Sequence, residues 1–290
     1  MQTPAPVDYA RASSVEDALR LLAEKGEDAR LIAGGHSLLP MMRLRLAQPE
    51  WVIDINELRD LDYIRVEGDQ LVIGALTRHA ALLASSVVGE HYPIFHDAER
   101  VIADPVVRLH GTVGGSFCQA DPAEDLSAVG SALRATMVIR SADGSRTVPA
   151  REFHQGPYET AVGPAEILTE IRVPIRPGAG SAYEKVERRA GDWAVAAAGT
   201  YVLLRDGTVA DAGIGLTALG AEHFCAPEAE GYLAGKEPTE QALTEAGRLA
   251  AAATNPQPDQ RGPVDYKRHL AAELTIRALR RSAERAVGRG

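Results

Sequence analysis

Two pairs of adjacent glycines offer the clearest chemistry in this sequence. The first lies in the segment LIAGGHSLLP at residues 31–40, and the second in TVGGS at residues 112–116. Glycine tolerates a positive φ and has no Cβ, so a glycine pair can direct successive backbone N–H groups at one anion. A single pair is usually only a tight turn. Two loops of matching chemistry predict a site that holds a diphosphate from both sides.

Charged residues near these loops have two interpretations. Asp121 and Asp125 flank Pro122 and either form a charged first helical turn, which suits the helix dipole, or accept hydrogen bonds from sugar hydroxyls. The negative charge of a diphosphate also needs compensation. Candidate cations are Arg43, Arg45, Arg78 and Lys185, although backbone amides can carry most of this task.

We find no other nucleotide-binding or catalytic motif in a sequence context that supports it. The segment GIGLTA at residues 213–218 matches a dinucleotide fingerprint, but it lies in a β-rich stretch and opens no helix. The lysine of Gly235-Lys236 is followed by Glu237, so no P-loop is present. A serine nucleophile elbow is also absent. His36 and Ser37 are adjacent, which makes them better donors to a phosphate than a base and nucleophile.

The bulk properties exclude several classes of protein. The chain has 290 residues, so we expect two domains, and its net charge of −9 argues against binding to nucleic acid or an anionic membrane. Two cysteines, Cys118 and Cys225, cannot supply a disulfide scaffold, a four-thiolate zinc site or an iron–sulfur cluster from this chain alone. The histidines show no metal-binding spacing. Redox chemistry here would need an organic cofactor, and without a signal peptide pattern we expect a cytoplasmic protein.

Periodicity predicts the elements that position these residues. A helix is expected from Ser13 or Ser14 to Lys25, and a hairpin around Gly68-Asp69. Further expected helices cover residues 78–85, 94–102, 126–133, 226–233, 240–252 and 264–286. Expected strands cover residues 29–33, 52–55, 136–140, 167–173, 182–189, 194–204 and 209–219, the last two joined at Asp206-Gly207.

Together these motifs resemble a known family. The segment at residues 33–42, TVGGS at 112–116, ADPAEDL at 120–126 and YEKVERRAGDWA at 183–194 are similar to the FAD-binding medium subunits of molybdenum hydroxylases, and most of all to the aerobic carbon monoxide dehydrogenase type. The resemblance implies an α+β fold. Residues 1–176 would form an FAD-binding domain of the vanillyl-alcohol-oxidase and xanthine-dehydrogenase type, with subdomains 1–58 and 59–176. Residues 177–290 would form a C-terminal domain with a three-stranded antiparallel sheet and a helical bundle.

The same resemblance assigns the FAD contacts. The glycine loops would hold the diphosphate, Asp125 would bind the cofactor, Lys185 would lie near the flavin, and Trp193 would pack on the isoalloxazine ring. The full implied set is Ile32, Ala33, Gly34, Gly35, His36, Ser37, Leu38, Ile102, Thr112, Gly114, Gly115, Ser116, Ala120, Asp121, Asp125, Ile167, Leu168, Lys185, Asp192 and Trp193. Ser116 is a departure, because relatives carry Asn or Asp at this position. The hydrogen bond made there is therefore open.

The resemblance also implies a function. This chain would take electrons from the two [2Fe-2S] clusters of a small subunit and pass them through FAD to a quinone or other acceptor. A large subunit would oxidise CO to CO2 at a copper and molybdopterin cytosine dinucleotide molybdenum centre, in a dimer of heterotrimers. Any membrane contact, at the inner face of the cytoplasmic membrane, would come through the acceptor chain. The alternatives are a medium subunit serving an aldehyde, purine or N-heteroaromatic hydroxylase, a stand-alone flavin oxidoreductase, and an assembly module without flavin.

Overall fold

A small parallel sheet begins the computed structural model, which describes residues 3–288. Its strand order is β1-β3-β2, with β1 at Asp8–Arg11, β2 at Ala29–Ile32 and β3 at Trp51–Asp54. Helix α1, Val15–Lys25, starts as predicted because the Ser14 side chain accepts a hydrogen bond from the Asp17 amide. Strand β1 was not predicted, since it is short and largely exposed and shows no alternation. Helix α2, Leu38–Arg43, follows the first glycine pair.

A five-stranded antiparallel sheet forms the second part, in the order β4-β5-β10-β6-β7. The predicted hairpin is confirmed as β4, Ile64–Glu67, and β5, Gln70–Gly74. Strand β10, Ile167–Pro174, lies between β5 and β6, Thr136–Ser141, so nearly all of its residues are buried. Strand β7, Gly144–Pro149, was missed because its mostly exposed residues have no apolar pattern. A short hairpin, β8 at His154–Gly156 and β9 at Glu159–Thr160, follows helix α9, Ala150–Phe153.

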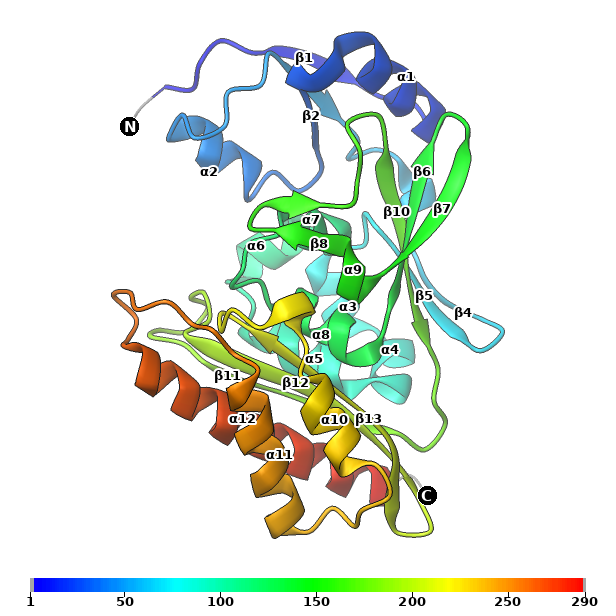
Figure 1. Ribbon diagram of the computed structural model, residues 1–290. Helices are drawn as coiled ribbons and strands as arrows, with labels where there is room; N and C mark the ends of the chain where they lie inside the picture. Colours follow the sequence, from blue (N-terminus) through cyan, green and yellow to red (C-terminus); the bar gives the residue numbers. More distant parts are fainter. Residues whose placement is uncertain (1–2, 289–290) are drawn as a thin grey trace.

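Short helices pack between this sheet and the C-terminal sheet (Figure 1). They are α3 at His79–Ala84, α4 at Ser86–His91, α5 at Pro93–Val101, α6 at Pro105–His110, α7 at Val113–Gln119 and α8 at Asp125–Leu133. The expectation of a loop at the second glycine pair is wrong. Gly114 and Gly115 lie in the first turn of α7, because Thr112 caps the helix by accepting a hydrogen bond from the Gly115 amide. Asp121 lies in the turn before α8, outside the helix where we placed it as one option.

The C-terminal part is a three-stranded antiparallel sheet with helices, as predicted. Its strands are β11 at Gly180–Val186, β12 at Ala196–Arg205 and β13 at Thr208–Thr217, and its helices are α10 at Pro227–Leu233, α11 at Glu240–Ala252 and α12 at Val264–Val287. The glycines of the rejected fingerprint lie in β13. A Cβ on Gly213 or Gly215 would collide with carbonyl oxygens of α8, so these glycines allow the helix to approach the strand.

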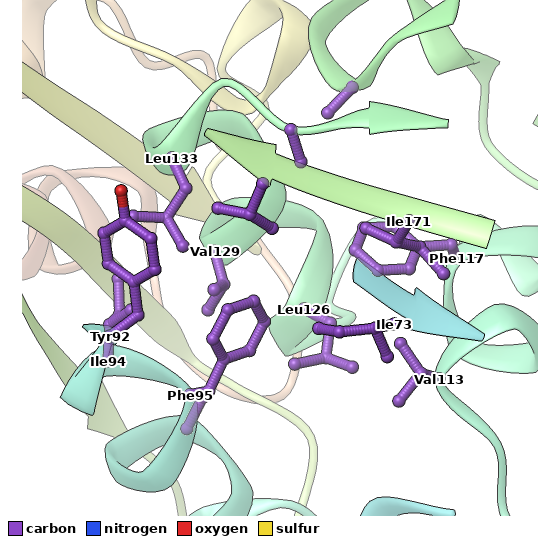
Figure 2. Packing of buried hydrophobic residues seen from close by; sticks show 14 of the residues in the cluster. Ile73, Tyr92, Ile94, Phe95, Val113, Phe117, Leu126, Val129, Leu133 and Ile171 are labelled. Carbon is purple, nitrogen blue, oxygen red and sulfur yellow. The ribbon is translucent and has the colours of Figure 1, made fainter. Parts of the chain in front are cut away.

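Two apolar clusters meet at strand β12. Ala197 and Tyr201 face the cluster around α8 and α5, whereas Ala196, Ala198 and Val202 face the cluster around α11 and α12. Figure 2 shows the first cluster, where side chains from α5 and α8 point toward one another. Ion pairs from Arg281 and Arg285 to Asp97 of α5 also hold α12 in place. In residues 3–288 we find no helix with the length and apolar character needed to cross a membrane.

Candidate functional site

A cavity of about 920 Å³ opens between the two glycine segments and the loop that joins β11 to β12. This volume lies near the upper end of the range for small-molecule and cofactor sites. Most of the residues that the resemblance assigns to FAD are in its wall: Ile32, Ala33, Gly34, Gly35, His36, Ser37, Leu38, Ile102, Thr112, Gly114, Gly115, Ser116, Asp125, Ile167, Leu168, Asp192 and Trp193. Ala120, Asp121 and Lys185 are not.

The first glycine segment presents free backbone donors to this cavity. Gly35 has φ 75°, a conformation that favours glycine. Within residues 3–288, the N–H groups of Gly34, Gly35, His36 and Ser37 donate to no other protein group. The Asn56 side chain holds the loop from behind by donating to the Ala33 carbonyl, 2.5 Å away. Consecutive unpaired amides of this kind make an anion-binding concavity.

The second glycine segment presents a side chain to the cavity, and its glycine amides are not free. The Gly114 amide donates to the Ala75 carbonyl at 2.8 Å, and the Gly115 amide donates to the Thr112 hydroxyl at 3.1 Å. A Cβ on Gly114 would lie 2.6 Å from the Ala75 Cβ, so this glycine is required for packing against the end of β5. The amides of this segment are thus already paired. What it offers to the cavity is the half-buried hydroxyl of Ser116.

The cavity wall contains an arginine that was not predicted, Arg30, whose guanidinium donates to the carbonyls of Glu27 and Ala29. Arg78 lies behind the loops, where its guanidinium donates to the His110 carbonyl and to the Asn56 side chain. Arg45 donates to the Thr3 carbonyl. None of the four candidate cations, which also include Arg43 and Lys185, is in the cavity wall formed by the described residues. The free backbone amides and Arg30 are therefore the sources of positive potential beside the first loop.

A buried polar group closes the inner end of the cavity. Asp125, at the start of α8, accepts hydrogen bonds from the Tyr183 hydroxyl at 2.7 Å and from the Lys185 ammonium at 2.9 Å. Burial raises the pKa of Asp125, and the Lys185 charge opposes that shift. Lys185 also donates to the Val101 carbonyl and is almost inaccessible. Its ammonium therefore acts on the cavity through Asp125.

Glu124 is the second buried carboxyl at this end of the cavity. It caps α8 by accepting from the amides of Leu126 and Ser127. Burial raises its pKa to about 7.

The outer rim carries an exposed aromatic ring. Trp193 is 43% exposed, although it follows the wall residues Gly191 and Asp192. Gly191 has φ 75° and packs against the Ala103 backbone, which brings this loop to the cavity. The Asp192 carboxylate accepts from the Trp193 amide at 2.9 Å. A flat apolar surface is thus held at the mouth of the cavity.

Ala120 and Asp121 lie beside the site. Ala120 ends α7 in a left-handed conformation, and its carbonyl accepts from the Tyr158 amide. The Asp121 carboxylate accepts from the Tyr158 hydroxyl at 3.1 Å. Tyr158 itself is in the wall. These two residues therefore support a wall residue.

The structure adds a polar chain that motif reasoning missed. His79 Nδ1 lies 2.9 Å from the Glu99 carboxylate, and its Nε2 lies 3.1 Å from the Ser116 hydroxyl. A hydrolase triad has the same connectivity, but the Ser116 amide donates to the Thr112 carbonyl and is not free to stabilise an oxyanion. The three residues come from α3, α5 and α7, so no sequence motif could reveal them.

Metal binding is not indicated in the described part of the chain, which contains no group of three or more His, Cys, Asp or Glu side chains placed to hold an ion.

Comparison with known proteins decides the family. Residues 5–176 match the model "FAD binding domain in molybdopterin dehydrogenase", and residues 181–282 match "CO dehydrogenase flavoprotein C-terminal domain". The chain belongs to the FAD-binding medium subunits of the molybdenum hydroxylases. It is 42% identical to the carbon monoxide dehydrogenase medium chain of Afipia carboxidovorans, over 98% of this chain and 99% of the relative. It is 36% identical to the glyceraldehyde dehydrogenase medium chain of Sulfolobus acidocaldarius, over 97% and 99%.

Solved structures of this family show the same architecture. A crystal structure of Cu,Mo-CO dehydrogenase superposes with a TM-score of 0.94 at 42% identity, covering 98% of this chain and 100% of that one. Quinoline 2-oxidoreductase from Pseudomonas putida 86 gives a TM-score of 0.91 at 31% identity, covering 98% and 99%. The predicted family, the α+β architecture, FAD as the cofactor class and the role as an oxidoreductase subunit are thereby confirmed.

Proposed function

We propose that this medium subunit carries FAD in the 920 Å³ cavity and transfers electrons from partner iron–sulfur clusters to a quinone or other acceptor in a carbon monoxide dehydrogenase. The observation that supports it most directly is the row of free amides from Gly34 to Ser37 on one wall of a cofactor-sized cavity. We also propose the division into residues 1–176 and 177–290, in which the cavity lies mainly in the first domain.

The residues present fit FAD. The amides of Gly34 to Ser37 and the side chains of His36 and Ser37 would bind the diphosphate. Ile167 and Leu168 offer apolar surface for the adenine or the flavin ring, and Trp193 offers a flat face for stacking. When bound, FAD would supply the redox chemistry, while the protein positions it and sets its polarity. No side-chain nucleophile is required.

Partner subunits would supply the remaining centres. We propose a small subunit with two [2Fe-2S] clusters and a large subunit with the molybdenum cofactor and copper, in a dimer of heterotrimers. Two cysteines in this chain agree with that division of labour. In this arrangement the protein would work in the cytoplasm, and any membrane contact would come through the acceptor.

A different substrate is the second candidate. Relatives of nearly full length include the Sulfolobus glyceraldehyde dehydrogenase medium chain and the nicotine 6-hydroxylase medium subunit of Paenarthrobacter nicotinovorans, which is 34% identical. A medium subunit carries no substrate pocket for the molybdenum chemistry in this proposal. The present cavity would therefore serve equally in an assembly that oxidises an aldehyde or an N-heteroaromatic compound.

The test compares the isolated chain with the assembly. We expect the isolated chain to bind one FAD and to oxidise none of the candidate substrates. Co-expressed with its large and small subunits, it should show anaerobic bleaching of the visible flavin absorbance when CO is added. Bleaching by an aldehyde or a purine, and not by CO, would select the second candidate. Turnover of a small organic substrate by the isolated chain would contradict the subunit role, and absence of FAD from both preparations would contradict FAD carriage.

A further inference from the structure

We propose that His79, held by Glu99, is a positioning residue that switches the Ser116 hydroxyl between donating and accepting a hydrogen bond toward bound FAD. This inference rests on the proposed FAD site. It concerns two side chains outside the residues that the family resemblance assigns to FAD. It also gives a specific role to Ser116, whose hydroxyl lies in the cavity wall.

Burial and hydrogen bonds hold the His79 imidazole in one orientation. Glu99 on α5 is fully buried, and both of its carboxylate oxygens lie within 3.1 Å of His79 Nδ1. His79 is 3% exposed, and its backbone N–H donates to the Gly111 carbonyl. A carboxylate at Nδ1 keeps the proton on that nitrogen. The state of Nε2, which lies 3.1 Å from the Ser116 hydroxyl, then decides the direction of the last hydrogen bond.

The two protonation states present different groups to the cavity. With neutral His79, Nε2 accepts the Ser116 proton, and only oxygen lone pairs of Ser116 face the cavity. With protonated His79, Nε2 donates to the Ser116 oxygen, and the hydroxyl proton is free to point outward. The diphosphate of FAD offers only acceptors, and the edge of its oxidised isoalloxazine ring offers acceptors at N1, O2, O4 and N5 and one donor at N3. The donor state of Ser116 therefore matches nearly all of the polar atoms that either part of FAD would present to it.

The local charges raise the pKa of His79. Burial alone would lower the pKa of His79, but the carboxylates of Glu99, Glu124 and Asp125 together outweigh burial and raise it. Burial raises the pKa of Glu99, and His79 opposes that shift. Other charged or titratable groups also face this pair: Glu124 and Asp125 at the start of α8, Arg108 on α6, and His36 in the first glycine segment. A test must separate Ser116 from these groups.

The experiment measures FAD affinity of the full-length apoprotein from about pH 6 to pH 9, by quenching of FAD fluorescence. In the wild type we expect affinity for oxidised FAD to fall by about fivefold with rising pH, as one hydrogen bond is lost. Ser116→Ala removes the hydroxyl and leaves His79, Glu99, Glu124 and His36 in place. Its pH profile should lose this fall, and Ser116→Thr, which keeps a hydroxyl, should restore it.

A control variant uses Ser127, a second serine whose hydroxyl lies beside a histidine ring. Ser127 lies 3.3 Å from His154 Nε2 and donates to Glu124. Ser127→Ala removes a hydrogen bond from Glu124, whose pKa is about 7, but keeps Ser116 and His79, so the fall in affinity should persist even if its midpoint moves. A flat wild-type profile, an unchanged profile in Ser116→Ala, or loss of the profile only in Ser127→Ala would each overturn the inference. Failure of the wild type to bind FAD at any pH would instead contradict the proposed function.

The potential of the bound flavin gives an independent readout. His79→Gln keeps a polar group beside Ser116 that does not titrate. In this variant, the midpoint potential measured by dye-linked titration should lose the inflection with pH that the wild type shows. A merely structural role for His79 would change the stability or FAD content but leave that inflection in the protein that retains FAD.

Discussion

Gly34 packs directly on the backbone of Gly111, because a Cβ on Gly34 would lie 2.7 Å from the Gly111 Cα and closer still to the His110 carbonyl. The two glycine segments therefore meet at this point. A side chain at Gly34 or at Gly111 would push the first loop, with its free amides, away from the start of α7. The glycines at the second pair serve packing, as the contact of Gly114 with Ala75 shows.

Gly35→Ala is expected to separate FAD binding from general stability. Gly35 has φ 75°, so alanine there costs about 1–2 kcal/mol of loop stability and moves the free amides. We expect marked loss of FAD content, measured by flavin absorbance per chain. Gly207→Ala is the control, because Gly207 has φ 78°, open space at its Cβ position and no place in the cavity wall. Equal FAD loss in both variants would contradict the assignment of the first loop to the diphosphate.

Gly114→Val should lower the stability of the apoprotein, even when no FAD is present. Its side chain would meet the Ala75 backbone and Cβ, so we expect poor soluble yield or a strongly lowered Tm in the apoprotein. Thermal denaturation without FAD checks this expectation. A Gly114→Val apoprotein as stable as the wild type, yet unable to bind FAD, would show that this glycine faces the cofactor instead.

Lys185→Met should leave a buried carboxylate without its main partner. Asp125 would retain only the Tyr183 hydroxyl, and removal of one member of a buried ion pair typically costs about 3–5 kcal/mol. Urea denaturation should show this loss, whereas Lys236→Met, at an exposed lysine, should change stability little. Adding Asp125→Asn to Lys185→Met should recover part of the loss. If the double variant lost as much stability as the two single variants together, direct coupling of Lys185 to Asp125 would be contradicted.

Trp193→Ala should weaken FAD binding without weakening the fold. The ring is 43% exposed at the cavity mouth, so its removal leaves the apoprotein nearly as stable. Loss of a stacking surface worth about 1–3 kcal/mol predicts at least about a fivefold rise in the Kd for FAD. Fluorescence titration measures this value. Tyr266→Ala removes an equally exposed aromatic ring away from the cavity and should leave the Kd unchanged.

The loss of folding stability at acid pH should depend on His154. Burial lowers its pKa to about 4, while its ring packs against Phe117, Phe153 and Phe224. Between about pH 6.5 and pH 4 the unfolded chain takes up a proton that the folded chain does not, so stability falls as pH falls, by up to about 3 kcal/mol. Urea denaturation at several pH values should show a shallower fall in His154→Gln. An identical slope in both proteins would exclude His154 as the cause.

The sequence by itself determined the elements with strong local signals. The Ser14 cap, the hairpin at Gly68-Asp69 and the long α11 and α12 were predictable because capping, turn chemistry and periodicity act within a few residues. Most of the residues that the family motifs assigned to FAD also lie in the cavity wall. Strands β1 and β7 escaped prediction, since pairing with a neighbouring strand creates them and their own residues carry no pattern.

Only the tertiary structure decided how the site residues act. Glycine pairs look alike in sequence, yet the amides of the first are free and those of the second are bonded to Ala75 and Thr112. Lys185 is buried against Asp125, so it acts through that carboxylate. The chain from Glu99 through His79 to Ser116 joins three helices. Such relationships depend on packing between residues distant in the chain, and spacing along the sequence does not encode them.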